Sequence, residues 1–180
     1  MVYMFIAAGF EEIEALCPLD LMRRAGLEVT TVGIGSREIT GAHGITVKTD
    51  ISDSEYPTDV CPQMVFLPGG MPGTLNLSKS ETVINAIRKS VDNGSYVAAI
   101  CAAPSILGDM GVLSGKQAVC YPGFENRLTG ASIPNLKVVL DGNILTAKGM
   151  GAALEMGLAI VEIFCGKQAS DDLRRSVIAD

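Results

Sequence analysis

The chain has 180 residues, of which 48% are apolar and 19% are charged, and its net charge is −6. This length suits one domain with a buried core, and this composition is typical of a compact globular protein. The negative charge argues against a nucleic-acid surface, because phosphate binding requires clustered lysine and arginine. We therefore expect residues 1–180 to form a single domain without a nucleic-acid partner.

No apolar run approaches the roughly 20 residues that a membrane helix requires. Residues 1–9 lack a basic region before their apolar stretch, so they are interpreted as a first strand and not as a signal peptide. The five cysteines, at positions 17, 61, 101, 120 and 165, form no C-x-x-C pair. This spacing excludes a zinc ribbon and a dithiol redox motif. The sequence predicts a cytoplasmic protein with no membrane contact and no cysteine-based metal site.

The first half of the chain alternates short apolar runs with helical patterns. Residues 1–7 predict a buried strand, and a helix with acidic first turns follows, which closes at Arg23-Arg24 before Gly26. Along this helix Ile13, Cys17 and Leu21 recur at i+4 steps, and a proline at position 18 predicts a kink. Residues 28–34 predict a second strand, 37–50 a hairpin-like excursion, and 64–67 a third strand that runs into Pro-Gly-Gly.

The second half continues the alternation. Ser78 and Glu81 form a capping-box pattern ahead of a helix that ends near 93–94. Residues 95–100 predict a fourth buried strand, followed at once by Cys101 and a helix to about Asp109. Residues 117–122 and 137–146 predict short strands, and 152–164 and 168–177 predict helices. Strand–helix–strand alternation of this kind predicts an α/β fold with a mostly parallel central sheet and helices on both faces.

Cys101 is the strongest candidate for chemistry. It lies where a predicted strand ends and a helix begins, which is where ligands bind in open α/β sheets. Partial positive charge at the helix amino end favours a thiolate, so this position predicts a lowered pKa for the thiol. The alternative is a buried core cysteine, because the flanking alanines lack the glycines of the usual nucleophile elbow.

A catalytic thiol also requires a proton partner and donors for a developing oxyanion. Gly69, Gly70 and the N–H group of Ala102 are candidate donors. The first, third and fourth parallel strands end at one edge, so a glutamate after the first strand can reach Cys101. Glu14 is the best candidate, because a carboxyl half-buried beside a thiolate would keep its proton. An exposed helix charge is the alternative for this residue.

Other residues leave their roles open. His43 is the only histidine and lies in a Gly-Ala-His-Gly loop. A Cys–His pair would require that loop to fold over Cys101, and a solvated loop histidine is the alternative. Cys120 can approach the same edge or have a structural role, and Glu11 can serve the helix end or replace Glu14 as the partner.

Five motifs together resemble the ThiJ/PfpI superfamily and, within it, the branch of the parkinsonism-associated protein deglycase. They are Gly9-Phe10-Glu11-Glu12-Ile13-Glu14, Met22-Arg23-Arg24-Ala25-Gly26, Leu67-Pro68-Gly69-Gly70, Ala98-Ala99-Ile100-Cys101-Ala102-Ala103-Pro104 and Gly149-Met150-Gly151. The resemblance extends from Met1 to about Lys167. The order of these five motifs along the chain makes the resemblance more specific than any one motif alone.

The resemblance implies a flavodoxin-like α/β sandwich that forms a homodimer. It implies that Cys101 is a reactive elbow cysteine in a strained backbone conformation, and that Glu14 is a protonated glutamate beside its sulfur. Gly69, Gly70 and Ala102 match the backbone donors of the family. The implied activity is that of a cofactor-free glyoxalase or deglycase, acting on small α-oxoaldehydes such as methylglyoxal and glyoxal and on glycated amines or thiols.

Two other functions stay open at this point. One is an oxidative-stress sensor or redox-regulated chaperone in which Cys101 is oxidised to a sulfinate. The other is a hydrolase or amidotransferase-like enzyme. Some superfamily members carry histidine directly after the cysteine, where this chain has Ala102, and this argues against a peptidase triad. Tyr121 occupies a loop where the deglycase branch often has a histidine, so catalysis would depend on Cys101 and Glu14.

Overall fold

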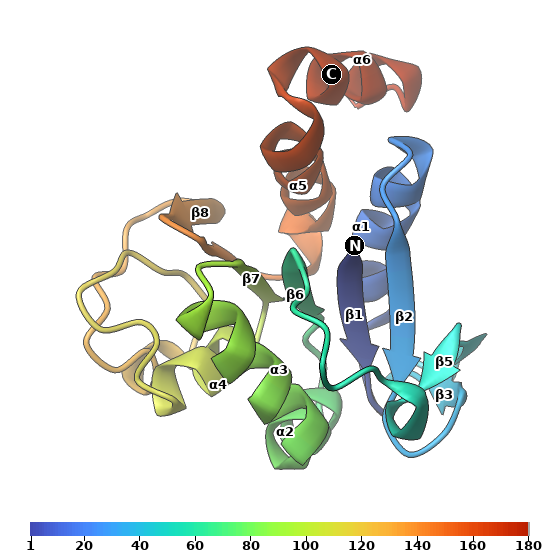
Figure 1. The fold of residues 1–180 in the computed structure, drawn as a ribbon. Coiled ribbons are helices and arrows are strands. Elements are labelled where there is room, and N and C mark those ends of the chain that lie inside the picture. The colour runs from blue at the N-terminus through green and yellow to red at the C-terminus, as the bar shows by residue number, and fades with distance from the viewer. Residues whose placement is uncertain (180) are drawn as a thin grey trace.

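In the computed structural model, which describes residues 1–179, seven strands form one sheet in the order β5-β2-β1-β6-β7-β9-β8 (Figure 1). They are β1 (Val2–Ile6), β2 (Val29–Gly33), β5 (Ile51–Ser52), β6 (Met64–Leu67), β7 (Tyr96–Ile100), β8 (Val138–Asp141) and β9 (Ile144–Ala147). All neighbouring strands are parallel except β8 and β9. The predicted mostly parallel central sheet is confirmed.

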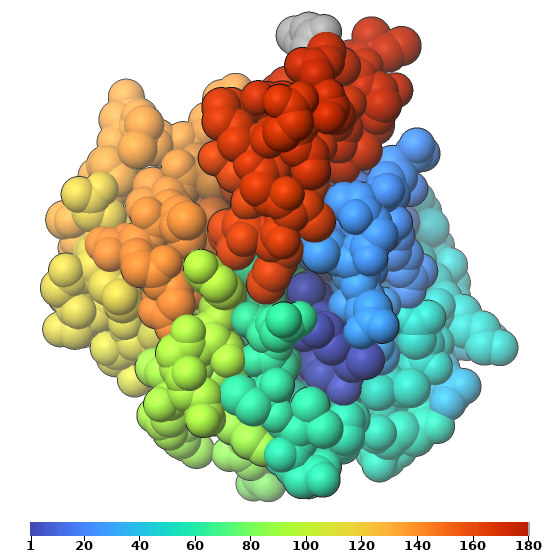
Figure 2. Space-filling view, turned by 45° about the horizontal axis from the view of Figure 1, so that its top comes forward, coloured from blue at the N-terminus to red at the C-terminus, as the bar shows by residue number. Residues whose placement is uncertain are grey.

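Helices cover both faces of this sheet, as predicted. One face carries α2 (Gly73–Lys79), α3 (Glu81–Asp92) and α4 (Pro104–Asp109), and the other carries α1 (Glu12–Arg24) and α5 (Ala153–Cys165). The last helix, α6 (Lys167–Ser176), packs against α5, and Figure 2 shows these C-terminal helices in red beside α1 in blue. Within residues 1–179 no helix is long and apolar enough to cross a membrane. The remaining elements are β3 (Glu38–Thr40), β4 (Thr46–Lys48), η1 (Asp53–Glu55), η2 (Glu125–Arg127) and η3 (Met150–Ala152).

The central strands are apolar throughout because helices bury both of their faces. In β1, Tyr3 and Phe5 point into the core beneath α2, α3 and α4, whereas Met4 and Ile6 point into the core beneath α1 and α5. Side chains alternate between the faces of a strand, so one short apolar run contributes to two cores. This is the physical reason why the continuous runs identified these strands correctly.

The buried face of α1 differs from the prediction. Ile13 is 49% exposed, whereas Ala15, Leu19 and Met22 face the sheet. At 3.6 residues per turn, Ile13 lies about 200° around the helix from Ala15 and therefore on the outer side. In the i+4 series only Ile13 is wrong, because Cys17 is half-buried against this core and Leu21 is buried.

Two further predictions require correction. Ser80, and not Ser78, caps α3, because its side chain accepts a hydrogen bond from the N–H of Val83 at 3.4 Å. Ser78 lies inside α2, a helix that the sequence did not predict. Residues 117–122 form no strand: Gln117 makes a single bridge, and the N–H of Val119 bonds to the side chain of Thr146 at 3.0 Å instead of to a neighbouring backbone.

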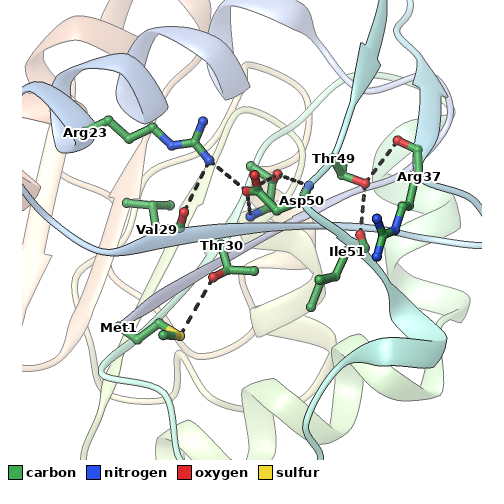
Figure 3. A network of polar contacts seen from close by, with 9 residues as sticks. Met1, Arg23, Val29, Thr30, Arg37, Thr49, Asp50 and Ile51 are labelled. Atoms are coloured by element: carbon green, nitrogen blue, oxygen red, sulfur yellow. Dashed lines mark hydrogen bonds and ion pairs between the residues drawn. The ribbon is translucent and has the colours of Figure 1, made fainter.

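A polar network ties the end of α1 to the edge of the sheet (Figure 3). The Asp50 carboxylate accepts hydrogen bonds from Arg23 at 2.7 Å and from the N–H and hydroxyl of Thr31 at 2.8 and 2.7 Å. Burial acts to raise the pKa of Asp50, but these bonds outweigh it and hold that pKa below its usual value. The charged form of Asp50 thus joins the end of α1 to β2, next to the short edge strand β5.

Candidate active site

Cys101 follows β7 directly and has a positive φ of 65°. A residue with a side chain rarely adopts this left-handed conformation, so the surrounding contacts must hold it. The N–H of Cys101 donates to the carbonyl of Ala147 at 2.9 Å, and its carbonyl accepts from the N–H of Tyr121 at 2.8 Å. These two bonds fix the backbone on both sides of a half-buried thiol.

Gly69 lies immediately against this thiol because β6 and β7 are parallel neighbours that end together. A Cβ atom on Gly69 would lie 2.5 Å from the Cβ of Cys101 and 2.5 Å from Oε2 of Glu14. Only glycine leaves room for the two side chains at this position. Gly70 has a φ of 91°, a conformation that glycine adopts at no steric cost.

Glu14 reaches the same place from the first turn of α1 and is 1% exposed. Its Oε2 accepts the N–H of Gly69 at 3.1 Å, and its carboxyl also hydrogen-bonds the Cys101 thiol. Burial raises the pKa of Glu14 to about 7, with the charge of Glu11 acting in the same direction and the hydrogen bonds opposing it. The alternative of an exposed helix charge is therefore wrong.

The predicted lowering of the Cys101 pKa does not occur. Burial, together with the charge and hydrogen bond of Glu14, raises the pKa of Cys101 to about 12, while the N–H groups of Gly70 and Ala102 act to lower it. The helix that was expected to stabilise a thiolate begins only at Pro104 and has six residues. Because thiol and carboxyl touch, they titrate as a pair, and near pH 7 that pair goes from two protons to one.

The structure brings all five predicted site residues together, but their backbone groups have different partners. The N–H of Gly69 is occupied by Glu14. The N–H groups of Gly70 and Ala102 face the Cys101 sulfur. Of the three candidate donors, Gly70 and Ala102 are thus the two whose N–H groups can stabilise a negative charge that develops at or beside the sulfur.

The neighbouring acidic residues hold the local structure. Oε2 of Glu11 accepts the N–H of Glu14 at 2.7 Å, so Glu11 caps the helix. Glu12, which is 3% exposed, accepts the N–H of His43 at 2.8 Å and contacts its Nδ1 at 2.9 Å. His43 is therefore paired with Glu12 and not with Cys101, although His43 and Cys101 line the same pocket. The role of Glu12 was missed, because spacing alone does not distinguish three glutamates in one helical turn.

These three side chains also satisfy the spacing of a metal site. Glu11, Glu12 and His43 offer ligand atoms within 4.8 Å of one another. Both oxygens of Glu12 already accept hydrogen bonds from the loop that contains His43. The arrangement is accounted for by the anchoring of that loop.

A cavity of about 570 Å³ opens over Cys101. Its walls are formed by Glu11, Glu14, His43, Cys101, Tyr121, Pro122, Lys137, Lys148, Gly149, Met150, Gly151 and Ala152. The Tyr121 ring lies against Gly149, where a Cβ atom would come within 3.2 Å of it. Cys120 is buried and does not line the cavity, which favours its structural role. Sequence reasoning missed the two lysines, because no motif marks them.

A parallel α/β sandwich that presents a cysteine in a left-handed turn, beside a buried glutamate, defines the flavodoxin-like proteins with an elbow cysteine. The chain belongs to the DJ-1/PfpI family, whose profile matches residues 1–163. This confirms the resemblance to the ThiJ/PfpI superfamily, and the relatives described next confirm the DJ-1 branch.

Curated relatives and solved structures agree on this branch. Protein dj-1beta of Drosophila melanogaster is 33% identical over 176 residues, which cover 96% of this chain and 94% of the relative. A Pyrococcus abyssi protein named as a deglycase is 33% identical over 152 residues, covering 83% of this chain and 90% of that protein. The structure of oxidized Toxoplasma gondii DJ-1 superposes with a TM-score of 0.94 at 28% identity, covering 98% of this chain and 97% of the other.

Proposed function

We propose that the protein is a cofactor-free glyoxalase or deglycase that acts through Cys101 on small α-oxoaldehydes and on early glycation adducts. The observation that carries this proposal is the contact between Cys101 and Glu14, whose pKa of about 7 lets the carboxyl gain and lose a proton at neutral pH. Membership of the DJ-1/PfpI family and a relative named as a deglycase support it.

The proposed reaction balances without an added oxidant. Glu14 takes the thiol proton as the Cys101 sulfur bonds to the aldehyde carbon of methylglyoxal, and then gives that proton to the former aldehyde oxygen, which completes a hemithioacetal and leaves Glu14 ionised. The proton on that carbon moves through Glu14 and an enediol to the neighbouring carbon, which leaves a thioester. Water then cleaves the thioester, so lactate leaves and the thiol is restored. The N–H groups of Gly70 and Ala102 stabilise the oxyanions along this path.

The test is lactate formation from methylglyoxal without glutathione. Wild-type protein is expected to convert methylglyoxal steadily, whereas Cys101→Ala is expected to show no rate above the uncatalysed reaction, because no sulfur remains to bond the aldehyde. Lactate is measured by enzymatic assay, with Cys61→Ala as the matched control. Cys61 is an exposed thiol outside the cavity. Equal rates for wild type and Cys101→Ala would overturn the proposal.

We further propose that a second copy of this chain covers the surface beside the cavity. Ile13, Ile45 and Met150 are 49%, 54% and 55% exposed. Met150 lines the cavity, the N–H of Ile45 faces Glu12 at 3.4 Å, and Ile13 follows Glu12 in the chain. Exposed apolar side chains gathered beside a site are typical of protein–protein contacts.

Wild-type protein is accordingly expected to sediment as a dimer, and Ile45→Glu as a monomer, because the new charge would be buried without a partner. Sedimentation velocity measures the mass. Leu140→Glu, at a 49% exposed position on β8, is the control and should leave the dimer intact. A monomeric wild-type protein would contradict the proposal.

A further inference from the structure

Two lysines stand in the cavity wall at directly opposed positions. Lys137 precedes β8 and Lys148 follows β9, and the N–H of Lys148 donates to the carbonyl of Lys137 at 2.9 Å. The antiparallel register, in which Val138 faces Ala147, places the two lysines opposite each other at the next position. Their side chains therefore leave the hairpin on the same side.

Like charges directly opposite each other on paired strands are destabilising. Among residues 1–179 neither Lys137 nor Lys148 forms an ion pair, and the ammonium of Lys148 contacts the neutral side-chain oxygen of Asn135 at 3.2 Å. The charge of Lys137 is felt by Glu155, but that carboxylate already pairs with Arg174 at 2.5 Å. The two lysines thus keep unneutralised charge in a chain whose net charge is −6.

The same hairpin places these charges close to the reactive sulfur. Strand β9 is the neighbour of β7, with Ala147 paired to Ile100, so Lys148 and Cys101 leave adjacent strands at the same edge. The acidic side chains of the cavity, Glu11 and Glu14, come instead from the start of α1. A ligand with a carbonyl at one end and an anion at the other would therefore bind with its carbonyl at the Cys101 sulfur and its anion at the lysines.

The cavity is also larger than a three-carbon aldehyde requires. Its volume of about 570 Å³ lies within the range of roughly 300–1,000 Å³ that is typical of small-molecule sites. The exposed side chains of Tyr121 and Met150 add apolar surface to the cavity wall. A substrate with several carbons between its carbonyl and its anion would use this space.

We propose that Lys137 and Lys148 form an oxyanion-binding subsite, so that the preferred substrates are oxo compounds carrying a carboxylate or phosphate at the end remote from the reacting carbonyl. This assignment rests on the proposed function for its reaction, but the subsite itself is testable without turnover. Lys137 and Lys148 act here as specificity-determining residues, and Cys101 and Glu14 remain the reacting groups.

The direct test compares two alkylating reagents that differ in charge. Iodoacetate and iodoacetamide each form an S–C bond with Cys101 as iodide leaves, and peptide mass spectrometry gives the rate at this thiol. Because both reagents meet the same sulfur, the ratio of their rates cancels changes in its pKa. The Lys137→Gln and Lys148→Gln double variant is expected to lower the iodoacetate-to-iodoacetamide ratio by about tenfold at low salt.

A Lys79→Gln variant is the control, since Lys79 is exposed on α2 and lies outside the cavity. Its ratio is expected to match that of wild type. A ratio in the double variant within twofold of wild type would overturn the subsite. So would a Cys101 that reacts with neither reagent, because the lysines would then face no accessible sulfur.

A second measurement separates this proposal from the proposed function. The kcat/KM for 4,5-dioxopentanoate, an α-oxoaldehyde with a remote carboxylate, is compared with that for the uncharged 2-oxopentanal. Wild type is expected to prefer the anion, and the double variant to lose about tenfold of that preference. If neither aldehyde reacts but the alkylation ratio still depends on the lysines, the subsite stands and the proposed reaction is wrong. If wild type turns over both aldehydes with equal kcat/KM, the proposed reaction stands and the subsite is wrong.

Discussion

Glu14→Gln is expected to reduce methylglyoxal turnover by about 10² to 10⁴-fold, the usual contribution of a positioned acid or base. Glutamine has the shape of glutamate and can still accept the N–H of Gly69, which donates to Oε2 at 3.1 Å. It cannot take the proton of Cys101. The loss of rate would therefore report proton transfer and not a change of shape.

The pH dependence of Cys101 alkylation gives a second readout of this pair. In wild type the pair loses its first proton near pH 7, where Glu14 titrates. The alkylation rate should rise through that pH and then level off until the second proton leaves. In Glu14→Gln the rise near pH 7 should disappear. Glu81→Gln, at an exposed position in the first turn of α3, is the matched control.

The same substitution is expected to stabilise the folded protein at high pH. The pKa of Glu14 rises from 4.5 to about 7 on folding, so the folded state holds its proton more tightly than the unfolded state. The contribution of this proton to the free energy of unfolding is complete below pH 4.5. As pH rises through 7, up to about 3 kcal/mol of that contribution is lost. Glutamine does not titrate, so the variant avoids this loss.

Urea unfolding at pH 4 and pH 8 measures the effect. The free energy of unfolding of Glu14→Gln, relative to wild type, should shift in favour of the variant by up to about 3 kcal/mol between these pH values. A constant difference at both pH values would mean that folding does not shift the pKa of Glu14, which would contradict the prediction. Unchanged turnover would instead identify Glu14 as a structural residue and direct attention to Glu11.

Features of the fold and the site that local sequence patterns decide were predicted correctly, whereas features that depend on tertiary contacts were missed. The strands that end near Leu67 and Ile100 are short apolar runs bounded by turns, and their local pattern was enough to place Cys101 beside Gly69. Parallel pairing then brought Glu14 to the same edge. These predictions depended on chain order and strand geometry, which the sequence carries directly.

Other features depend on contacts between distant segments. Ile13 was placed on the wrong side of α1, because a helical period does not reveal which stripe meets the sheet. The raised pKa of Cys101 follows from burial and from Glu14, neither of which is visible beside position 101 in the chain. Lys137 and Lys148 meet only through the pairing of β8 with β9. Their proximity becomes apparent only when the hairpin register is known.

Gly69→Ala is expected to remove turnover, to abolish the rise of Cys101 alkylation near pH 7, and to destabilise the fold. The added methyl would lie 2.5 Å from the Cβ of Cys101 and 2.9 Å from the carbonyl oxygen of Ile100. Neither atom is the end of a flexible side chain, so the backbone must shift. Overpacking of this kind costs about 1–3 kcal/mol, and for a chain of this size it lowers Tm by about 2–4 °C per kcal/mol.

Gly151→Ala is the matched control, because a Cβ at that position meets nothing within 4 Å. Thermal unfolding should leave the Tm of Gly151→Ala near that of wild type and lower the Tm of Gly69→Ala. The methyl of Gly69→Ala would also lie 2.5 Å from Oε2 of Glu14, so it separates the carboxyl from the thiol even in a chain that still folds. A folded Gly69→Ala with wild-type alkylation of Cys101 would show that the close approach of Glu14 and Cys101 is not what makes this thiol reactive.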